Sequence, residues 1–266
     1  MYLGLAVATL FAVFPFYWAA VISLFGNPYF PSLQLVPKFS TFTLDSYRNV
    51  LIARNFPVLF RNSLTVCVAT MVLGVGVSVL AAYALSRFTF LGKRTFGVGI
   101  LFSQALPGIV LAIPIYFVLM RLHLLNTHAG LVLTYLTFAV PFSTWMLWGY
   151  FNTIPLEIEE AGIVDGCSRI GVLVRIVLPL SGPGVGAVAL YTFMLAWEDF
   201  LYPLMILSSE KKQLLTVGAS LLISSQAIYW GQLMAYVVLS VLPITLLFAC
   251  LLRYFATGLT AGAMKE

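Results

Sequence analysis

The sequence predicts an all-α polytopic membrane protein. Of its 266 residues only 9% are charged and 61% are hydrophobic, and the mean hydropathy is +1.02. A soluble globular domain carries about a quarter charged residues, so this chain has too few to cover a surface that faces water. Six stretches are apolar for roughly 20 residues, the length that a helix needs to cross the hydrocarbon core of a bilayer.

The six predicted transmembrane helices are spread along the whole chain. They cover residues 2–25, 64–85, 96–120, 131–150, 177–207 and 233–255. The first lacks a basic start and a cleavage site of small residues, so we expect it to be a retained span and not a signal peptide. Several spans contain proline, which membrane helices tolerate where neighbouring helices or water satisfy the freed backbone groups. Pro107 and Pro114 lie in the third span, Pro141 in the fourth and Pro243 in the sixth.

Two segments between the spans are too polar to cross. Residues 26–62 are expected to cover the outer mouth, and residues 208–230 to form a short helix at the outer surface. Six spans place both termini on one side of the membrane. The basic residues divide seven to seven between the two sides, but the tight loop 87–94 holds three of them. This favours a cytoplasmic position for that loop and for the polar stretch 157–179 on the same side.

Several chemistries are excluded. The net charge of +5 comes from scattered Lys and Arg with no basic run, which indicates interface anchors and not a nucleic-acid surface. Cys67, Cys167 and Cys250 are far apart and predict neither disulfides nor a metal site. His123 and His128 lie in a loop without further ligands, whereas a metal site needs three or four.

No catalytic motif is present. The sequence contains neither G-x-S-x-G nor H-E-x-x-H. Gly92 and Lys93 are followed by arginine, and Arg87 stands where a phosphate-binding loop needs its first glycine. The chain is therefore predicted to be no enzyme and to have no nucleotide site of its own, so active transport would draw its energy from another subunit.

One charged spot interrupts the fifth span, at Trp197, Glu198, Asp199 and Phe200. Ionisable residues at membrane depth usually face a bundle interior or a water-filled path. Adjacent residues on a helix point about 100° apart, so the two acids cannot share a face, which argues against a paired-carboxylate catalyst. Two alternatives stay open: the four residues line a transport pathway, or the span ends near Trp197 and the acids lie at the outer interface.

The stretch 157–179 (EIEEAGIVDGCSRIGVLVRIVLP) is the other polar interruption. Pro155 suits the first turn of a helix, and the three glutamates that follow favour the positive end of the helix dipole. Asp165 and Gly166 should end this helix, and a second one should start near Ser168 and lead into the fifth span. The pattern predicts a helical segment to which a partner protein docks and through which it moves the attached span. An amphipathic interfacial loop is the alternative.

The spacing of this stretch resembles the EAA motif of ABC importer permeases, E-A-A-x3-G-x9-I-x-L-P. Its matching positions are Glu160, Ala161, Gly162, Gly166, Ile176, Leu178 and Pro179. Gly162 stands where the family has its second alanine; glycine preserves close packing but should loosen the helix by about 1 kcal/mol.

Further segments resemble the MalG-type permeases of carbohydrate ABC importers. They are residues 61–64, 81–94, 106–127, 141–147, 197–200 and 258–266. In the fifth of these, Glu198 and Asp199 replace the Asn-Glu pair of a W-N-E-F motif. The resemblance implies the type I ABC importer permease fold in the cell inner membrane, with both termini cytoplasmic. It divides the chain into a first helix with its outer segment (1–57) and a five-helix core (58–266) that includes a cytoplasmic coupling loop (151–177) and a C-terminal tail (256–266).

The resemblance also implies partners and site residues. The partners would be a second homologous permease, two ABC ATPase subunits that bind ATP and Mg, an extracytoplasmic solute-binding protein and membrane lipid. Glu160 and Asp165 would be polar anchors of the coupling helix, while Ala161, Gly162 and Gly166 would allow a close fit to the ATPase. The tail would make a secondary contact there through Gly258, Gly262 and Lys265.

Alternatives to this function remain. The few basic residues in the interior favour a neutral sugar as substrate, against glycerol phosphate or another small solute. An intramembrane hydrolase that uses Glu198 or Asp199 is a distant alternative, because no nucleophile–base motif accompanies them. A membrane scaffold that only recruits an ATPase is the third.

Overall fold

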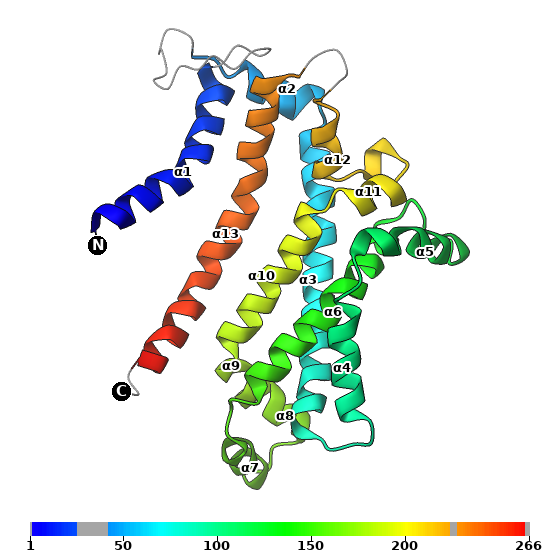
Figure 1. Ribbon diagram of the computed structural model, residues 1–266, viewed down its shortest axis with the longest axis vertical. Coiled ribbons are helices and arrows are strands. Elements are labelled where there is room, and N and C mark those ends of the chain that lie inside the picture. The colour runs from blue at the N-terminus through cyan, green and yellow to red at the C-terminus, as the bar shows by residue number, and fades with distance from the viewer. Residues whose placement is uncertain (1, 26–41, 224–227, 264–266) are drawn as a thin grey trace. The chain divides into compact units, whose positions relative to one another are not determined.

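The described part of the chain is built of helices (Figure 1). The computed structural model describes residues 2–25, 42–223 and 228–263. Within these ranges the only extended pairing is an isolated bridge between Ile223 and Ile228. The all-α class predicted from the sequence is confirmed.

The chain forms two compact units. Residues 1–63 and 209–246 make the first, and residues 64–208 and 247–266 make the second. Elements that lie wholly within the first unit are α1 (Tyr2–Phe25), α2 (Asp45–Ala53), the 3₁₀ helix η3 (Glu210–Lys212) and α12 (Leu215–Ser220). Two long helices contribute to both units, α3 (Phe56–Arg87) and α13 (Trp230–Ala263).

The second unit holds the remaining elements. They are α4 (Lys93–Ser103), α5 (Gly108–Arg121), α6 (His128–Phe151), α7 (Leu156–Val164), α8 (Arg169–Val172), the π-helix η2 (Leu173–Val177), α9 (Leu178–Leu180), α10 (Gly182–Glu198) and α11 (Leu201–Ile206). Helix α6 packs along both α4 and α10. Small residues permit this: a Cβ added at Gly184 would come within 2.7 Å of the Tyr150 ring, and one at Gly97 within 2.8 Å of Trp148.

In the first unit, polar side chains at the start of α3 fix the segment around η3 and α12. The Asn62 amide donates to the backbone carbonyls of Lys211 (2.9 Å) and Gln213 (3.1 Å). The Ser63 hydroxyl accepts from the backbone N–H of Leu215 at 2.8 Å, and the Tyr236 hydroxyl of α13 donates to the Leu215 carbonyl at 2.8 Å. The prediction of a short helix within 208–230 is confirmed by α12.

The predicted spans agree with the structure in part. Among the described residues, α1, α3, α6 and α13 are long and apolar enough to cross a membrane, and α8–α9 with α10, bent by 84°, would count as a fifth span. The stretch 96–120 was expected to form one continuous helix, and this is wrong. It is divided into α4 of 11 residues and α5 of 14, because Pro107 between them has no N–H to continue a helical ladder. The total of six spans stays a prediction.

Some predicted features lie at the limits of the described chain. Of the segment 26–62, residues 26–41 lie outside the described residues, and α2 follows them. Of the predicted tail contacts, Gly258 and Gly262 lie within α13, and Lys265 lies outside the described residues.

Candidate functional site

Helix α7 begins and ends where its sequence predicts. Pro155 is its N-cap residue, and acidic residues occupy the first turn. At the C-terminus Gly166 adopts φ +87°, a left-handed conformation that glycine reaches without a Cβ penalty. The backbone N–H of Gly166 donates to the carbonyl of Ile163, and that of Cys167 to the carbonyl of Gly162, both at 3.0 Å. These two bonds form a Schellman motif, so the chain reverses directly after α7.

The second helix of the loop starts at its predicted residue and then changes form. Ser168 caps α8 through its hydroxyl, which accepts from the backbone N–H of Gly171 at 3.1 Å. The π-helix η2 follows and leads into α9. The chain then bends by 84° into α10. At the bend the hydroxyl and the backbone N–H of Ser181 both donate to the carbonyl of Val177, at 2.7 and 2.9 Å.

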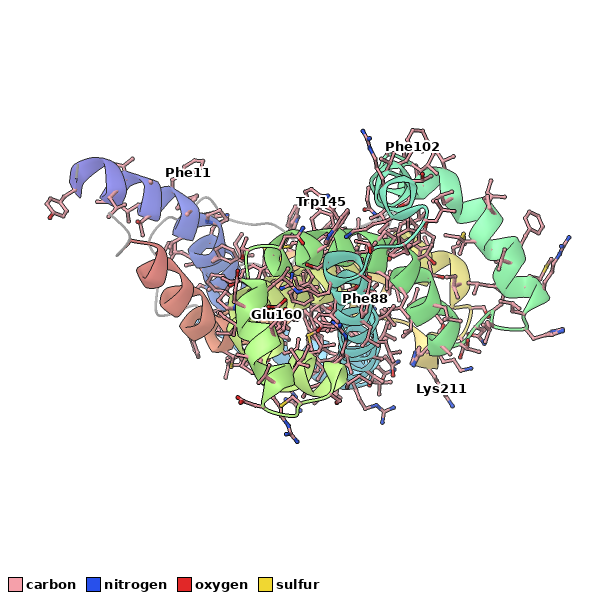
Figure 2. All side chains as sticks on the ribbon, turned by 90° about the horizontal axis from the view of Figure 1, so that it is seen from below. Phe11, Phe88, Phe102, Trp145, Glu160 and Lys211 are labelled. Carbon is pink, nitrogen blue, oxygen red and sulfur yellow. The ribbon has the colours of Figure 1, made fainter. Side chains whose placement is uncertain are left out.

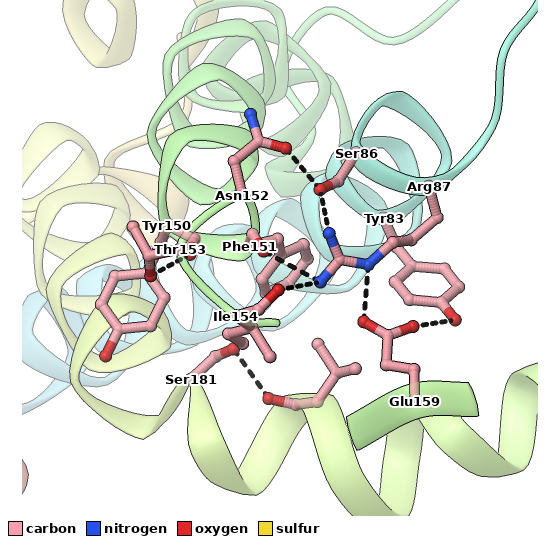
Figure 3. A network of polar contacts seen from close by, with 11 residues as sticks. Tyr83, Ser86, Arg87, Tyr150, Phe151, Asn152, Thr153, Ile154, Glu159 and Ser181 are labelled. Carbon is pink, nitrogen blue, oxygen red and sulfur yellow. Dashed lines mark hydrogen bonds and ion pairs between the residues drawn. The ribbon is translucent and has the colours of Figure 1, made fainter. Parts of the chain in front are cut away.

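A buried ion pair connects α7 to the end of α3 (Figure 3). The Nε of Arg87 lies 2.5 Å from Oε1 of Glu159, and the two side chains are only 4% and 5% exposed. The Tyr83 hydroxyl, one turn earlier on α3, donates to the other carboxylate oxygen of Glu159 at 2.9 Å. Both oxygens of the carboxylate are therefore held by α3, as a buried charge requires.

The same arginine also satisfies the C-terminal end of α6. Its Nη2 donates to the backbone carbonyls of Phe151 (2.9 Å) and Ile154 (3.2 Å), which lie at and just beyond the end of that helix. Its Nη1 donates to the Ser86 hydroxyl, which in turn donates to Oδ1 of Asn152 at 2.6 Å. Arg87 thus joins α3, α6 and α7 through its fork of donors.

Apolar packing supports this connection. Tyr83, Phe151, Val172 and Val177 belong to one buried cluster, together with residues of α6 and α10. Gly162 lies on the buried face of α7, where an added Cβ would overlap the end of the Ile176 side chain. Two positions of the predicted motif therefore contact each other inside this chain.

The outward face of the loop carries the other motif residues. Glu160, Ala161, Asp165, Gly166 and Pro179 are exposed, whereas Leu178 is partly buried. Figure 2 looks onto the end of the second unit that α7 occupies and labels Glu160 there.

Large apolar side chains accompany these exposed residues. Val164 is 87% exposed and Ile170 is 72% exposed. Leu156 and Ile163 on α7 and Val174 on η2 are also exposed. Exposed apolar side chains beside polar ones suit a surface that contacts a partner protein or the membrane interface.

The sequence prediction missed the inward residues Tyr83, Arg87 and Glu159. One signal was available, because Glu159 precedes Gly162 by three residues and therefore lies on the same helix face. The cation–π contact of Arg169 on α8, 5.4 Å from the ring of Phe88, is a second link between the loop and the chain just after α3.

The charged spot at the end of α10 separates its two acids, as expected. Helix α10 ends at Glu198, which is exposed. Asp199 is partly buried and accepts, through Oδ2, from the Tyr135 hydroxyl (3.0 Å) and the Tyr202 backbone N–H (3.1 Å). Trp197 is buried and stacks on Phe193, whereas Phe200 is exposed. Among the described residues no group of three or more His, Cys, Asp and Glu is placed to hold a metal ion.

Comparison with known proteins shows extensive similarity to transport permeases. The chain is 36% identical to the inner membrane ABC transporter permease protein YcjP of Escherichia coli, over 99% of this chain and 95% of that protein. It is 33% identical to the trehalose/maltose transport system permease protein MalG of Thermococcus litoralis, over 99% of this chain and 95% of that protein. The diacetylchitobiose uptake system permease protein NgcG of Streptomyces coelicolor is 32% identical, over 83% of this chain and 74% of that protein.

The fold is shared with a solved structure of a bacterial ABC transporter involved in the import of the acidic polysaccharide alginate. The TM-score is 0.80 at 22% identity, over 95% of this chain and 94% of that one. Residues 74–260 match the family described as binding-protein-dependent transport system inner membrane component. With these matches and its apolar helices, the chain belongs to the inner-membrane permeases of binding-protein-dependent ABC transporters.

Proposed function

We propose that this chain is one of two permease subunits of an ATP-driven importer for a neutral sugar. It would form half of the translocation pathway and receive mechanical work from an ATPase through α7 and the loop around it. The relatives named for trehalose/maltose and for diacetylchitobiose support a sugar, since these compounds are neutral saccharides.

The observation that carries this proposal is the buried connection between α7 and α3. A helix that only lay on the membrane surface would have no need of an ion pair 4% and 5% exposed beneath it. Because Arg87, Glu159 and Tyr83 hold α7 to the end of α3, a displacement of α7 by a partner would move that long helix as well. The exposed Glu160 and Asp165, with the apolar Val164 and Ile170 beside them, would form the surface that the ATPase grips.

The assembly that follows contains a second homologous permease, two ABC ATPase subunits and an extracytoplasmic solute-binding protein. ATP and Mg would be bound by the ATPase subunits, and this chain would contribute no catalytic residue. In the proposed orientation α7 and both termini lie on the cytoplasmic side of the inner membrane. The C-terminal tail, through Gly258, Gly262 and Lys265, would add a secondary contact with the ATPase.

The test is to isolate the intact assembly. The tagged chain is solubilised gently from its native cells, and the mass of the complex and of its components is measured. We expect a second permease and two ATPase chains, and ATP-dependent uptake of trehalose, maltose or diacetylchitobiose after reconstitution in liposomes. A lone chain or a self-dimer that persists in several detergents would contradict the proposal.

A further inference from the structure

A pocket of about 240 Å³ lies beside Asp199 in the second unit. It is formed by α6, α10, α11 and the junction between α4 and α5, and we call it the Asp199 pocket. The residues that matter for its chemistry are Gln104, Tyr135, Phe138, Tyr191, Asp199 and Tyr202. Its volume lies just below the roughly 300–1,000 Å³ of pockets for drug-sized ligands, so it would take one ring of a larger ligand.

One side of the Asp199 pocket is rigidly built. The hydroxyl of Tyr135 and the backbone N–H of Tyr202 both donate to the carboxylate of Asp199. The hydroxyl of Tyr202 donates to the carbonyl of Gly108, at the start of α5, at 2.7 Å. Tyr135 is 1% exposed and Tyr202 is 5% exposed. The carboxylate is therefore fixed in place before any ligand arrives, which lowers the entropy cost of binding.

The lining also offers aromatic rings and an amide. The ring centroids of Phe138 and Tyr202 are 5.5 Å apart, and those of Tyr191 and Phe142 on α6 are 4.3 Å apart. Phe138 and Tyr191 are partly buried, and Gln104 is exposed. Rings with an apolar face suit the C–H face of a sugar, while the amide and carboxylate suit its hydroxyl groups. Apolar walls with a few placed polar groups are the usual composition of a ligand site.

The charge of the Asp199 pocket selects among saccharides. Its lining contains a carboxylate and no Lys, Arg or His. A carboxylate of the ligand would lie beside a like charge without a cation to neutralise it, and such a juxtaposition discriminates against the wrong ligand. A neutral saccharide meets no such penalty. A substrate path is moreover one of the functional sites that ionisable residues within a membrane bundle mark.

We propose that the Asp199 pocket contacts one ring of a neutral saccharide during translocation and disfavours acidic saccharides. This inference rests on the proposed function. Tyr191 and Phe138 supply the ring faces, Gln104 binds hydroxyl groups, and Asp199 both binds hydroxyls and repels a uronate. Of the four residues noted in the sequence at 197–200, Asp199 is then the one that faces the substrate.

The test measures uptake by the complete importer, purified with its partner subunits and reconstituted in liposomes. The probes are trehalose, maltose, diacetylchitobiose and, as an acidic saccharide, digalacturonate. We expect Tyr191→Ala to raise the KM for a neutral probe by about fivefold, the effect of losing one aromatic contact, with little change in kcat. Tyr116→Ala is the matched control, because Tyr116 lies on α5 outside the pocket; its KM should not change.

A second variant tests the charge. Asp199→Asn keeps an oxygen that accepts from Tyr135 and Tyr202 but removes the negative charge. It should lower the ratio of neutral to acidic probe uptake, and an unchanged ratio would contradict the role of the Asp199 charge.

Three results would overturn the inference. They are an unchanged KM in Tyr191→Ala, an equal rise in Tyr116→Ala, and equal uptake of neutral and acidic probes by the unmodified importer. An assembly that lacks ATPase subunits would instead defeat the proposed function, so the two failures are distinguishable.

Discussion

Replacing Glu159 with alanine tests whether the buried ion pair holds α7 in place. The change leaves the guanidinium of Arg87 buried with its carboxylate partner missing, and it leaves the Tyr83 hydroxyl without its acceptor. Removing one partner of a buried pair costs about 3–5 kcal/mol. The bonds from Arg87 to the carbonyls of Phe151 and Ile154 remain, which favours the lower end of that range.

The assay is hydrogen–deuterium exchange of the backbone amides of α7, measured by mass spectrometry on the purified protein in a lipid nanodisc. A local cost of about 3 kcal/mol corresponds to roughly a hundredfold faster exchange, since about 1.4 kcal/mol is a factor of ten. The effect should be confined to α7, the end of α6 and the end of α3, because only these helices share the bonds of Arg87, Tyr83 and Glu159.

A double variant separates the ion pair from simple packing. Replacing a buried pair by apolar residues of similar size is often nearly neutral, so Arg87→Met with Glu159→Leu should exchange more slowly than Glu159→Ala alone. The double variant should not regain the full protection of the unmodified protein, because the carbonyls at the end of α6 lose their donor at a cost of about 1–3 kcal/mol. Two results would refute the reasoning. One is an exchange rate of the α7 amides in Glu159→Ala that lies within threefold of the rate in the unmodified protein. The other is a double variant whose α7 amides exchange no more slowly than those of Glu159→Ala.

Three further predictions concern single positions. In Gly166→Leu the added Cβ meets no atom within 4 Å, but the residue must adopt φ +87°, at a cost of about 1–2 kcal/mol. We expect the chain to stay in the membrane while the reconstituted importer hydrolyses ATP without sugar uptake. Full uptake would contradict docking at α7. Gly162→Leu overfills the contact with Ile176, so thermal unfolding should show that the free energy of unfolding falls by about 1–3 kcal/mol. Adding Ile176→Ala to the same chain should restore part of this free energy. Asn62→Ala leaves two carbonyls without their donor, so limited proteolysis should cut residues 209–215 faster, whereas an unchanged rate would show that this amide does not fix the segment.

The sequence was sufficient wherever structure is decided by neighbouring residues. Pro155 at the start of α7, Gly166 after its end and Ser168 at the next N-cap act through their own backbone or through residues three or four positions away. The predicted helix–turn–helix was therefore confirmed, as was the membership in the permease family that its spacing suggested.

The sequence was insufficient wherever the partner is distant or the local rule is permissive. Arg87 and Glu159 are separated by 72 positions, and no pattern in the sequence states that they meet. Tyr135 and Asp199 are likewise 64 positions apart. Proline inside an apolar stretch is compatible with both a kinked helix and a broken one. At Pro107 the helix breaks, whereas at Pro141 α6 continues.

The division of α7 into an inward and an outward face has a genetic consequence. Defects at Glu160 or Asp165, which face outward, should be relieved by second-site suppressors in the gene of the ATPase that grips them. Defects at Glu159 or Gly162 should be relieved only by suppressors within this gene, because their contacts lie in the same chain. A suppressor screen over residues 159–165 would thus separate positions that act through the ATPase from positions that act through contacts within this chain.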